Sequence, residues 1–336
     1  MKRVDELMAT CPLKHEIRVD FWEPYIRKLK RKPVSYLTLY SPPLMDVKYF
    51  HNCGLIEEND GVYQNVVGVG FNTDAEADTT ARLDKRLELL LSGNINTLIT
   101  GDKSKPEKVK QLESKFPFDV INLDYTDTLH NYSREEELSP HISAIETILE
   151  RQSKRNKEDF ILFVTTDANM PAYLPKFIED LRALIDKNIA ETPQFSERLK
   201  RATNCNNSTE YFNRFQKDCF AVSLVKFILG LLSDYSYTIV KGDIKWLIRD
   251  QRDEEKRMLH LGFHIKRFMP PKINSRSAIG NRRNNVEAKS VGFIAKDYYA
   301  ITEKNDLDRL KRLHAEQLND FNRRTFELDV PEPKDE

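Results

Sequence analysis

The first half of the chain alternates short apolar runs with longer amphipathic segments. The apolar runs are rich in β-branched and aromatic residues, which favours strands, whereas the amphipathic segments carry apolar residues at helical spacing. The sequence predicts strands at 34–40, 66–71, 96–100, 118–123 and 160–165 and helices at 75–91, 106–115 and 139–153. Strands that are continuous apolar runs and alternate with helices are typical of a parallel sheet covered on both faces. We therefore expect a doubly wound, mostly parallel α/β fold.

After residue 171 this alternation ends. The pattern there predicts helices at 174–191 and 210–233, and then a late antiparallel strand pair at 257–268 and 290–301 around a basic loop. A charged amphipathic helix is expected at 306–324. The expected organisation is a basic helical N-terminal extension (1–32), an α/β domain (33–305, with its core at 34–168, a helical insertion at about 171–235 and the strand pair at about 257–301) and a C-terminal charged helix and tail (306–336).

The composition mainly excludes kinds of binding partner and site. The chain has 53 basic and 53 acidic residues, so its formal net charge is zero and no overall field attracts it to nucleic acid or to a membrane. The four cysteines show no CxxC pair and the histidines show no ligand spacing, so no metal is expected. The N-terminus has no apolar signal region, and the run 219–233 is shorter than the ~20 residues that span a bilayer. We expect a cytoplasmic protein that does not enter a membrane.

Polar residues gather where the predicted strands end. They are Ser41, the trio 72–74, Gly101 with Asp102, the stretch 124–127 and the stretch 165–167. In open α/β sheets, ligands bind outside the carboxyl ends of the strands. These clusters therefore predict the position of a site.

Two strand ends carry a family resemblance. The stretch from Phe118 to Asp127 (FDVINLDYTD) and the stretch from Ile161 to Ala168 (ILFVTTDA) resemble the fourth and fifth strands of class I S-adenosylmethionine-dependent methyltransferases, nearest to the tRNA guanine-N2 methyltransferase type. The resemblance implies that Asp124 accepts hydrogen bonds from the amino group to be methylated. It also implies that Tyr125 stacks on the base.

The same resemblance implies a cofactor, S-adenosylmethionine, with Ser41, Asp74 and Asp102 as its contacts. The family also has a glycine-rich turn after the first strand, because a side chain there would collide with the cofactor. This chain has LYSPPLMD at residues 39–46 and no acidic residue directly at the end of the second strand. Capping of a helix accounts for Asp74 equally well, and turn chemistry accounts for Asp102.

Two basic stretches are candidates for contact with RNA or DNA. One is 27–32 and the other begins at Lys266 and runs to Lys289. The candidate residues are Arg27, Lys28, Arg267, Arg276, Arg282 and Arg283. A solvated charged face explains such runs as well.

The sequence therefore leaves three functions open. The chain is a methyltransferase acting on nucleic acid, or an inactive methyltransferase-like subunit that binds nucleic acid or a protein partner. The third alternative is that the sheet binds another adenine or nucleotide ligand, because the fold alone does not determine function.

Overall fold

A computed structural model describes most of the first 268 residues and one short strand beyond them. The described residues are 14, 17–41, 44–70, 85–125, 128–129, 139–167, 175–207, 209–210, 221, 224–225, 227–248, 257–268 and 297–300. Among them, no helix combines the length and the apolar character needed to cross a bilayer.

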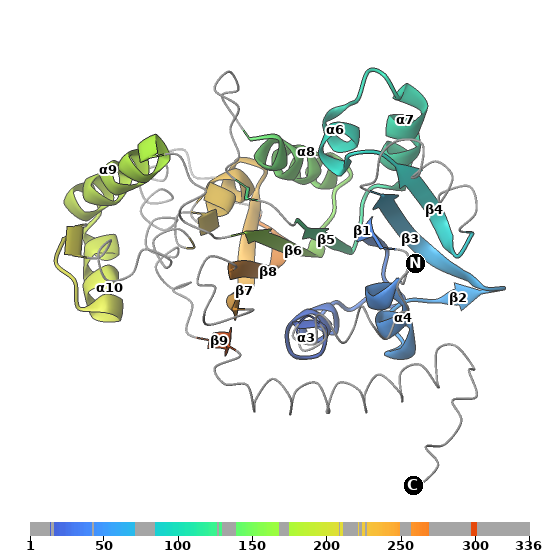
Figure 1. The fold of residues 1–336 in the computed structure, drawn as a ribbon, viewed down its shortest axis with the longest axis horizontal. Helices are drawn as coiled ribbons and strands as arrows, with labels where there is room; N and C mark the ends of the chain where they lie inside the picture. The colour runs from blue at the N-terminus through green and yellow to red at the C-terminus, as the bar shows by residue number, and fades with distance from the viewer. Residues whose placement is uncertain are drawn as a thin grey trace, which may run out of the picture.

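A nine-stranded mixed sheet runs through the molecule (Figure 1). Its strands are β1 (Tyr36–Tyr40), β2 (Glu58–Asn59), β3 (Val62–Gly70), β4 (Leu87–Ser92), β5 (Val120–Asp124), β6 (Asp159–Asp167), β7 (Tyr237–Ile248), β8 (Arg257–Arg267) and β9 (Asp297–Ala300). The order is β2-β3-β1-β5-β6-β8-β7-β9, and β4 pairs with β3. Strands β4, β3, β1, β5 and β6 are mutually parallel, whereas β8 is antiparallel to both β6 and β7. The predicted α/β class and the mostly parallel sheet are confirmed.

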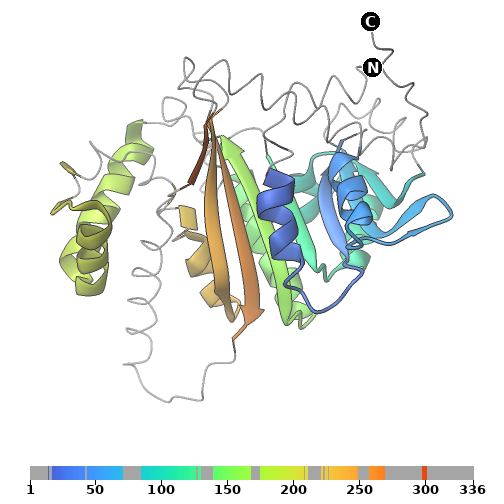
Figure 2. The same cartoon turned by 90° about the horizontal axis from the view of Figure 1, so that it is seen from below.

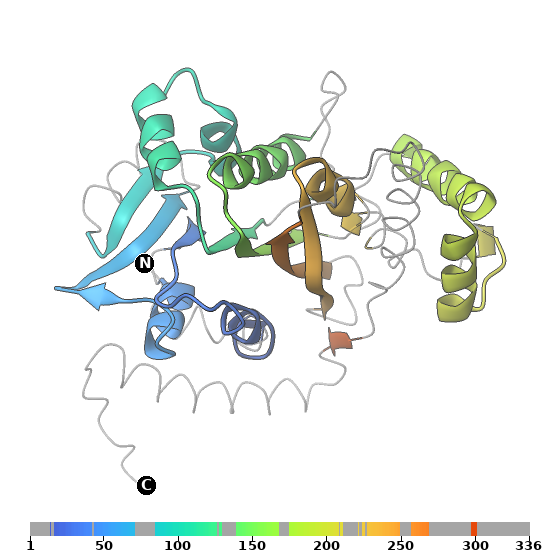
Figure 3. The same ribbon diagram turned by 180° about the vertical axis from the view of Figure 1, so that it is seen from behind.

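Helices cover both faces of this sheet. A π-helical turn η1 (Ile17–Trp22), α3 (Glu23–Ile26) and α4 (Met45–Asn52) cover one face, and α6 (Ile95–Thr100), α7 (Pro106–Lys115) and α8 (Pro140–Lys154) cover the other (Figure 1). Each face has its own buried apolar cluster. Two further helices, α9 (Pro175–Glu191) and α10 (Pro193–Thr203), stand apart from the sheet and pack on each other (Figure 3).

The predicted third strand is wrong. Residues 95–100 form helix α6, and the third long strand is β4, which begins inside the segment 75–91 for which a helix was expected. Residues 75–84 of that segment lie outside the described residues. Ile95, Leu98 and Ile99 are buried and follow the i, i+3, i+4 spacing of a helix face. Asn94 fixes the start of this helix, because its side-chain oxygen accepts a hydrogen bond from the backbone N–H of Asn96 at 2.8 Å.

We expect Asn94→Ala to lower the free energy of unfolding by about 1 kcal/mol, because the mutant loses the cap of α6. Urea denaturation measures this loss. Asn94→Asp keeps a capping oxygen and serves as the control. An equal loss in both variants would contradict the capping role.

The late strand pair also differs from the expectation. The antiparallel partner of β8 is β7, a strand that the sequence pattern did not predict, whereas β9 pairs in parallel with β7. Strand β7 was missed because Lys241, Asp243 and Lys245 interrupt its apolar pattern. Of the predicted strand 290–301, the described residues are 297–300, and the loop 269–289 and the helix 306–324 lie outside the described residues.

The described part of the N-terminal segment is a layer of the fold. Its helical part ends at Ile26, earlier than the predicted boundary at residue 32. The rings of Phe21, Trp22 and Tyr25 each lie about 6 Å from the ring of Phe163 on β6, at 6.1, 5.8 and 6.1 Å. Gly262 on β8 makes this approach possible, because a Cβ there would lie 2.7 Å from the Phe21 ring. Figure 2 shows this helical segment, in dark blue, standing beside the strands of the sheet.

Candidate functional site

The strand order reverses between β1 and β5. From β1 the chain first adds β3 and β4 on one side and then β5 and β6 on the other. In doubly wound sheets, such a switch point leaves a crevice at the carboxyl ends of the strands, where ligands bind. Tyr40 ends β1 and Asp124 ends β5 at this edge. The sequence therefore located Asp124 correctly at the carboxyl edge.

The N-terminal segment brings two cations to this edge. Lys14 forms an ion pair with Asp124, and Arg18 forms one with Asp46 in the first turn of α4. We call these four residues the ion-pair cluster. The side chains of Asp124, Arg18 and Asp46 are 14%, 7% and 17% exposed. The carboxylates at the switch point are thus held by cations of the same chain.

Charge pairing sets the protonation of the cluster. Burial alone would raise the pKa of the Asp124 carboxyl, but Lys14, and then His260, outweigh it and lower this pKa below its ordinary value. Burial alone would lower the pKa of Lys14, but Asp124, and then Asp46, raise it. Both partners are therefore charged at neutral pH.

Uncharged polar side chains surround the cluster on the same face of the sheet. The Thr165 hydroxyl and His260 Nδ1 share a hydrogen bond of 2.9 Å. Asn122 donates to the Tyr36 hydroxyl at 3.0 Å, and burial raises the pKa of this phenol well above its ordinary value. In the described part of the chain, no three His, Cys, Asp or Glu side chains gather in a way that could hold a metal ion.

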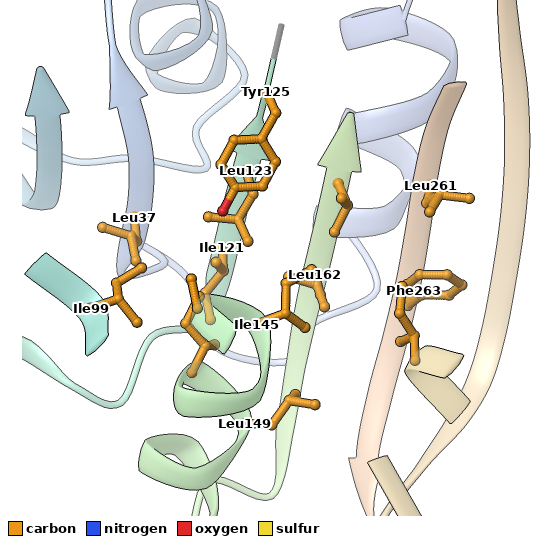
Figure 4. Close-up of a cluster of buried hydrophobic side chains, with 14 of the residues drawn as sticks. Leu37, Ile99, Ile121, Leu123, Tyr125, Ile145, Leu149, Leu162, Leu261 and Phe263 are labelled. Carbon is orange, nitrogen blue, oxygen red and sulfur yellow. The ribbon is translucent and has the colours of Figure 1, made fainter. Parts of the chain in front are cut away.

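Tyr125 is not arranged as the resemblance implies. It lies on the opposite face, 2% exposed within the cluster of buried apolar side chains (Figure 4). Its hydroxyl donates to Asn96 Oδ1 at 2.7 Å, and its ring centroid lies 4.2 Å from that of His141. A ring buried in this way has no face for a base. The alternation of side chains along β5 explains this position, because Tyr125 follows Leu123 on the face that α6 and α8 cover.

Asp102 does not follow a strand. Because residues 95–100 are helical, Asp102 lies beyond α6, and its carboxylate accepts hydrogen bonds from the backbone N–H of Ser104 at 2.8 Å and from its hydroxyl at 2.6 Å. These bonds lower the pKa of the Asp102 carboxyl. The residue therefore closes the turn before α7, whereas the end of β4 is Ser92. The strand-end position predicted for Asp102 is wrong.

Of the three residues that the resemblance implies as contacts of S-adenosylmethionine, only Ser41 lies at the carboxyl edge among the described residues. Ser41 is exposed after β1, and Asp74 lies outside the described residues. In the turn before α4, Leu44 adopts the left-handed conformation (φ 52°) that favours glycine, and its side chain is buried. The nearby carboxylate of Asp46 is already paired with Arg18.

The basic candidates lie elsewhere. Arg27 pairs with Glu23 at 2.6 Å, and the Lys28 ammonium lies 4.3 Å from the centroid of the Tyr25 ring. Burial, and then the Lys241 ammonium, lower the pKa of Lys28 to about 8. Arg267 ends β8 and donates to Asn156 at 2.6 Å. The other three candidates, Arg276, Arg282 and Arg283, lie outside the described residues.

Sequence reasoning missed Lys14 and Arg18 as site residues. The available signal was their spacing of four residues, with the apolar Ile17 and Phe21 on the same stretch. On a helix, that spacing puts two cations on one face. Nothing in the local sequence says that this face meets the ends of β1 and β5.

The fold and the ion-pair cluster define an α/β protein with a largely parallel sheet. Its strand order reverses between β1 and β5, and charged side chains lie at this switch point. Over residues 11–328 the chain matches the PP_RS20740-like family, and it belongs to that family. No curated protein matches the chain. The family name specifies no activity.

Proposed function

We propose that this chain is a methyltransferase-like protein that acts as a binding subunit and does not transfer methyl groups. The support for the methyltransferase-like part is the sheet. The sheet has five parallel strands, and the chain adds them first on one side of β1 and then, from β5 onward, on the other side. An antiparallel pair, β7 and β8, follows them. This arrangement is compatible with the fold that the resemblance of the two strand ends implied, with β7 in place of the predicted partner of β8.

The ion-pair cluster carries the second part of the proposal. An amino group to be methylated would need the carboxylate of Asp124 as its hydrogen-bond acceptor, and Lys14 occupies that carboxylate. The aromatic residue expected to stack on a base, Tyr125, is buried on the other face of the sheet. Both groups that would position an acceptor are therefore engaged within the protein.

A methyltransferase is the second candidate, and the position of Asp124 favours it. The residue stands at the switch point, where ligands of doubly wound sheets bind. In this case the N-terminal segment would act as a cover, and Lys14 would have to leave Asp124 before an acceptor could bind.

Calorimetric titration with S-adenosylmethionine and S-adenosylhomocysteine tests the proposal. We expect neither ligand to release heat at millimolar concentration, because the carboxylates at the edge are already paired with Lys14 and Arg18. Lys14→Ala is titrated in parallel. Micromolar binding by the unmodified chain would overturn the proposal, and binding by Lys14→Ala alone would favour the covered methyltransferase.

A further inference from the structure

The opposite edge of the sheet has a pocket of its own. At the edge where the parallel strands begin, a pocket of about 450 Å³ opens between the turn after α3 and the starts of β5 and β6. Its lining residues are Leu29, Lys30, Arg31, Asp119, Lys157, Glu158, Asp159, Lys266 and Arg267. We call it the basic pocket.

The charges of this pocket do not cancel locally. Asp119 forms an ion pair with Lys157, and Asp159 pairs with His264. Among the lining residues this leaves the cations Lys30, Arg31, Lys266 and Arg267 against the carboxylates of Glu158 and Asp159, because the His264 imidazole carries a charge only when it is protonated. Within the described part of the chain, no carboxylate pairs with any of these four cations. A cavity lined in this way attracts an anion.

The fold assembles the pocket from both basic stretches of the sequence. Strand β8 runs antiparallel to β6, so its last residues meet the first residues of β6, with Lys266 opposite Asp159. The backbone N–H of Arg267 donates to the carbonyl of Glu158 at 2.7 Å. The buried Leu29 fixes the other basic stretch in the turn that leads to β1. Residues far apart in the chain therefore face one cavity.

An exposed aromatic residue follows these cations. Phe268 directly follows Arg267, and 45% of its surface is exposed. Its backbone N–H donates to the carbonyl of Ser236 at 2.8 Å, so its main chain is held in place. Exposed aromatic rings beside a basic groove are the elements with which proteins bind unpaired bases.

We infer that the basic pocket binds the phosphate backbone of a single-stranded nucleic acid and that Phe268 stacks on one of its bases. Cations from the turn after α3 and from β8 supply phosphate contacts along one edge, and an exposed ring requires a base that is not already paired. The net charge of the chain is zero, so the attraction comes from this local group of cations. The inference names the partner of the binding subunit proposed above and rests on that role.

Fluorescence anisotropy of the full chain with labelled oligo(dT) and oligo(U) of about 20 nucleotides tests the inference. Lys30→Ala/Arg31→Ala should weaken binding at least about tenfold and make the salt dependence shallower, by about 0.7 for each phosphate that the variant no longer neutralises. Phe268→Ala should weaken it about tenfold with little change in the salt slope. These side chains are exposed, so the variants should keep the fold. Lys187→Ala/Lys200→Ala, which removes two exposed cations on α9 and α10, is the matched control.

Three results would overturn the inference. They are equal affinity in the pocket variant and in the control, tighter binding of duplex than of single strands, and displacement of the oligonucleotide by micromolar AMP, which would make the pocket a mononucleotide site. The test is separate from the titration with S-adenosylmethionine, because the two sites lie at opposite edges of the sheet. Failure here removes the nucleic acid as partner, whereas micromolar cofactor binding removes the proposed function.

Discussion

Phe163→Ala should lower the free energy of unfolding by about 3–5 kcal/mol, the usual cost of removing a fully buried aromatic side chain. Phe163 is 1% exposed, and its ring contacts those of Phe21, Trp22 and Tyr25. The mutation therefore opens a cavity between β6 and the N-terminal layer. Urea denaturation followed by tryptophan fluorescence measures the loss, and Trp22 reports directly from the site.

The control for this mutation is Val240→Ala, because Val240 on β7 is 55% exposed. It should change the free energy of unfolding by no more than about 0.5 kcal/mol. A loss below about 1 kcal/mol for Phe163→Ala would mean that the N-terminal layer does not pack on β6 as described.

Asp124→Ala should cost about 3 kcal/mol of stability, because it leaves the ammonium of Lys14 at the sheet edge without its counter-charge. Guanidinium chloride is a poor denaturant for this experiment, since its salt screens charges. Urea denaturation at low ionic strength is the appropriate measurement. Combining Asp124→Ala with Lys14→Met removes both charges and should recover most of the loss. If the double variant is as unstable as the single one, the ion pair is not the cause.

The same pair gives a pH dependence with a defined sign. The pKa of Asp124 is lowered in the folded chain, so its contribution is complete above the unfolded pKa of about 4 and is lost as the pH falls through the folded value. The pKa of Lys14 is raised, so its contribution is complete below about pH 10 and is lost as the pH rises through the folded value. Asp124→Asn should remove this part of the acid limb, while other carboxyls with a lowered pKa, such as Asp102, keep their share. Unchanged acid unfolding in that variant would contradict the assignment.

The elements that the sequence predicted well are those whose pattern has one interpretation. Residues 106–115 and 139–153 carry helical spacing, and the structure places helices at Pro106–Lys115 and Pro140–Lys154. Ile95–Thr100 was mistaken for a strand because a short apolar run does not distinguish a buried strand from a helix. Strand β7 was missed for the opposite reason. Its charged residues interrupt the apolar pattern of a strand, and pairing with its neighbours stabilises it.

For the candidate site, too, some features follow from the local sequence and others do not. The position of Asp124 followed from the end of an apolar run, which is local information. Its partner Lys14 and the meeting of two basic stretches at one pocket depend on long-range packing, which no pattern in either segment encodes. The face of the sheet on which Tyr125 lies depends on the strand register, because a shift of one residue moves a side chain to the other face.

The N-terminal layer has a consequence for the synthesis of the chain. Tyr25 donates a hydrogen bond at 2.7 Å to Asp243, 218 residues later, and Phe21 covers Gly262 on β8. At 5–20 residues per second, ribosomes need roughly 10–45 s to reach β7 and β8, which complete the surface on which these aromatic side chains pack. During that time Phe21, Trp22 and Tyr25 are exposed on a nascent chain, which makes them a natural binding site for chaperones. Slow translation or a shortage of chaperones should therefore reduce the yield of this protein more than that of a protein whose first helix packs on its nearest neighbours.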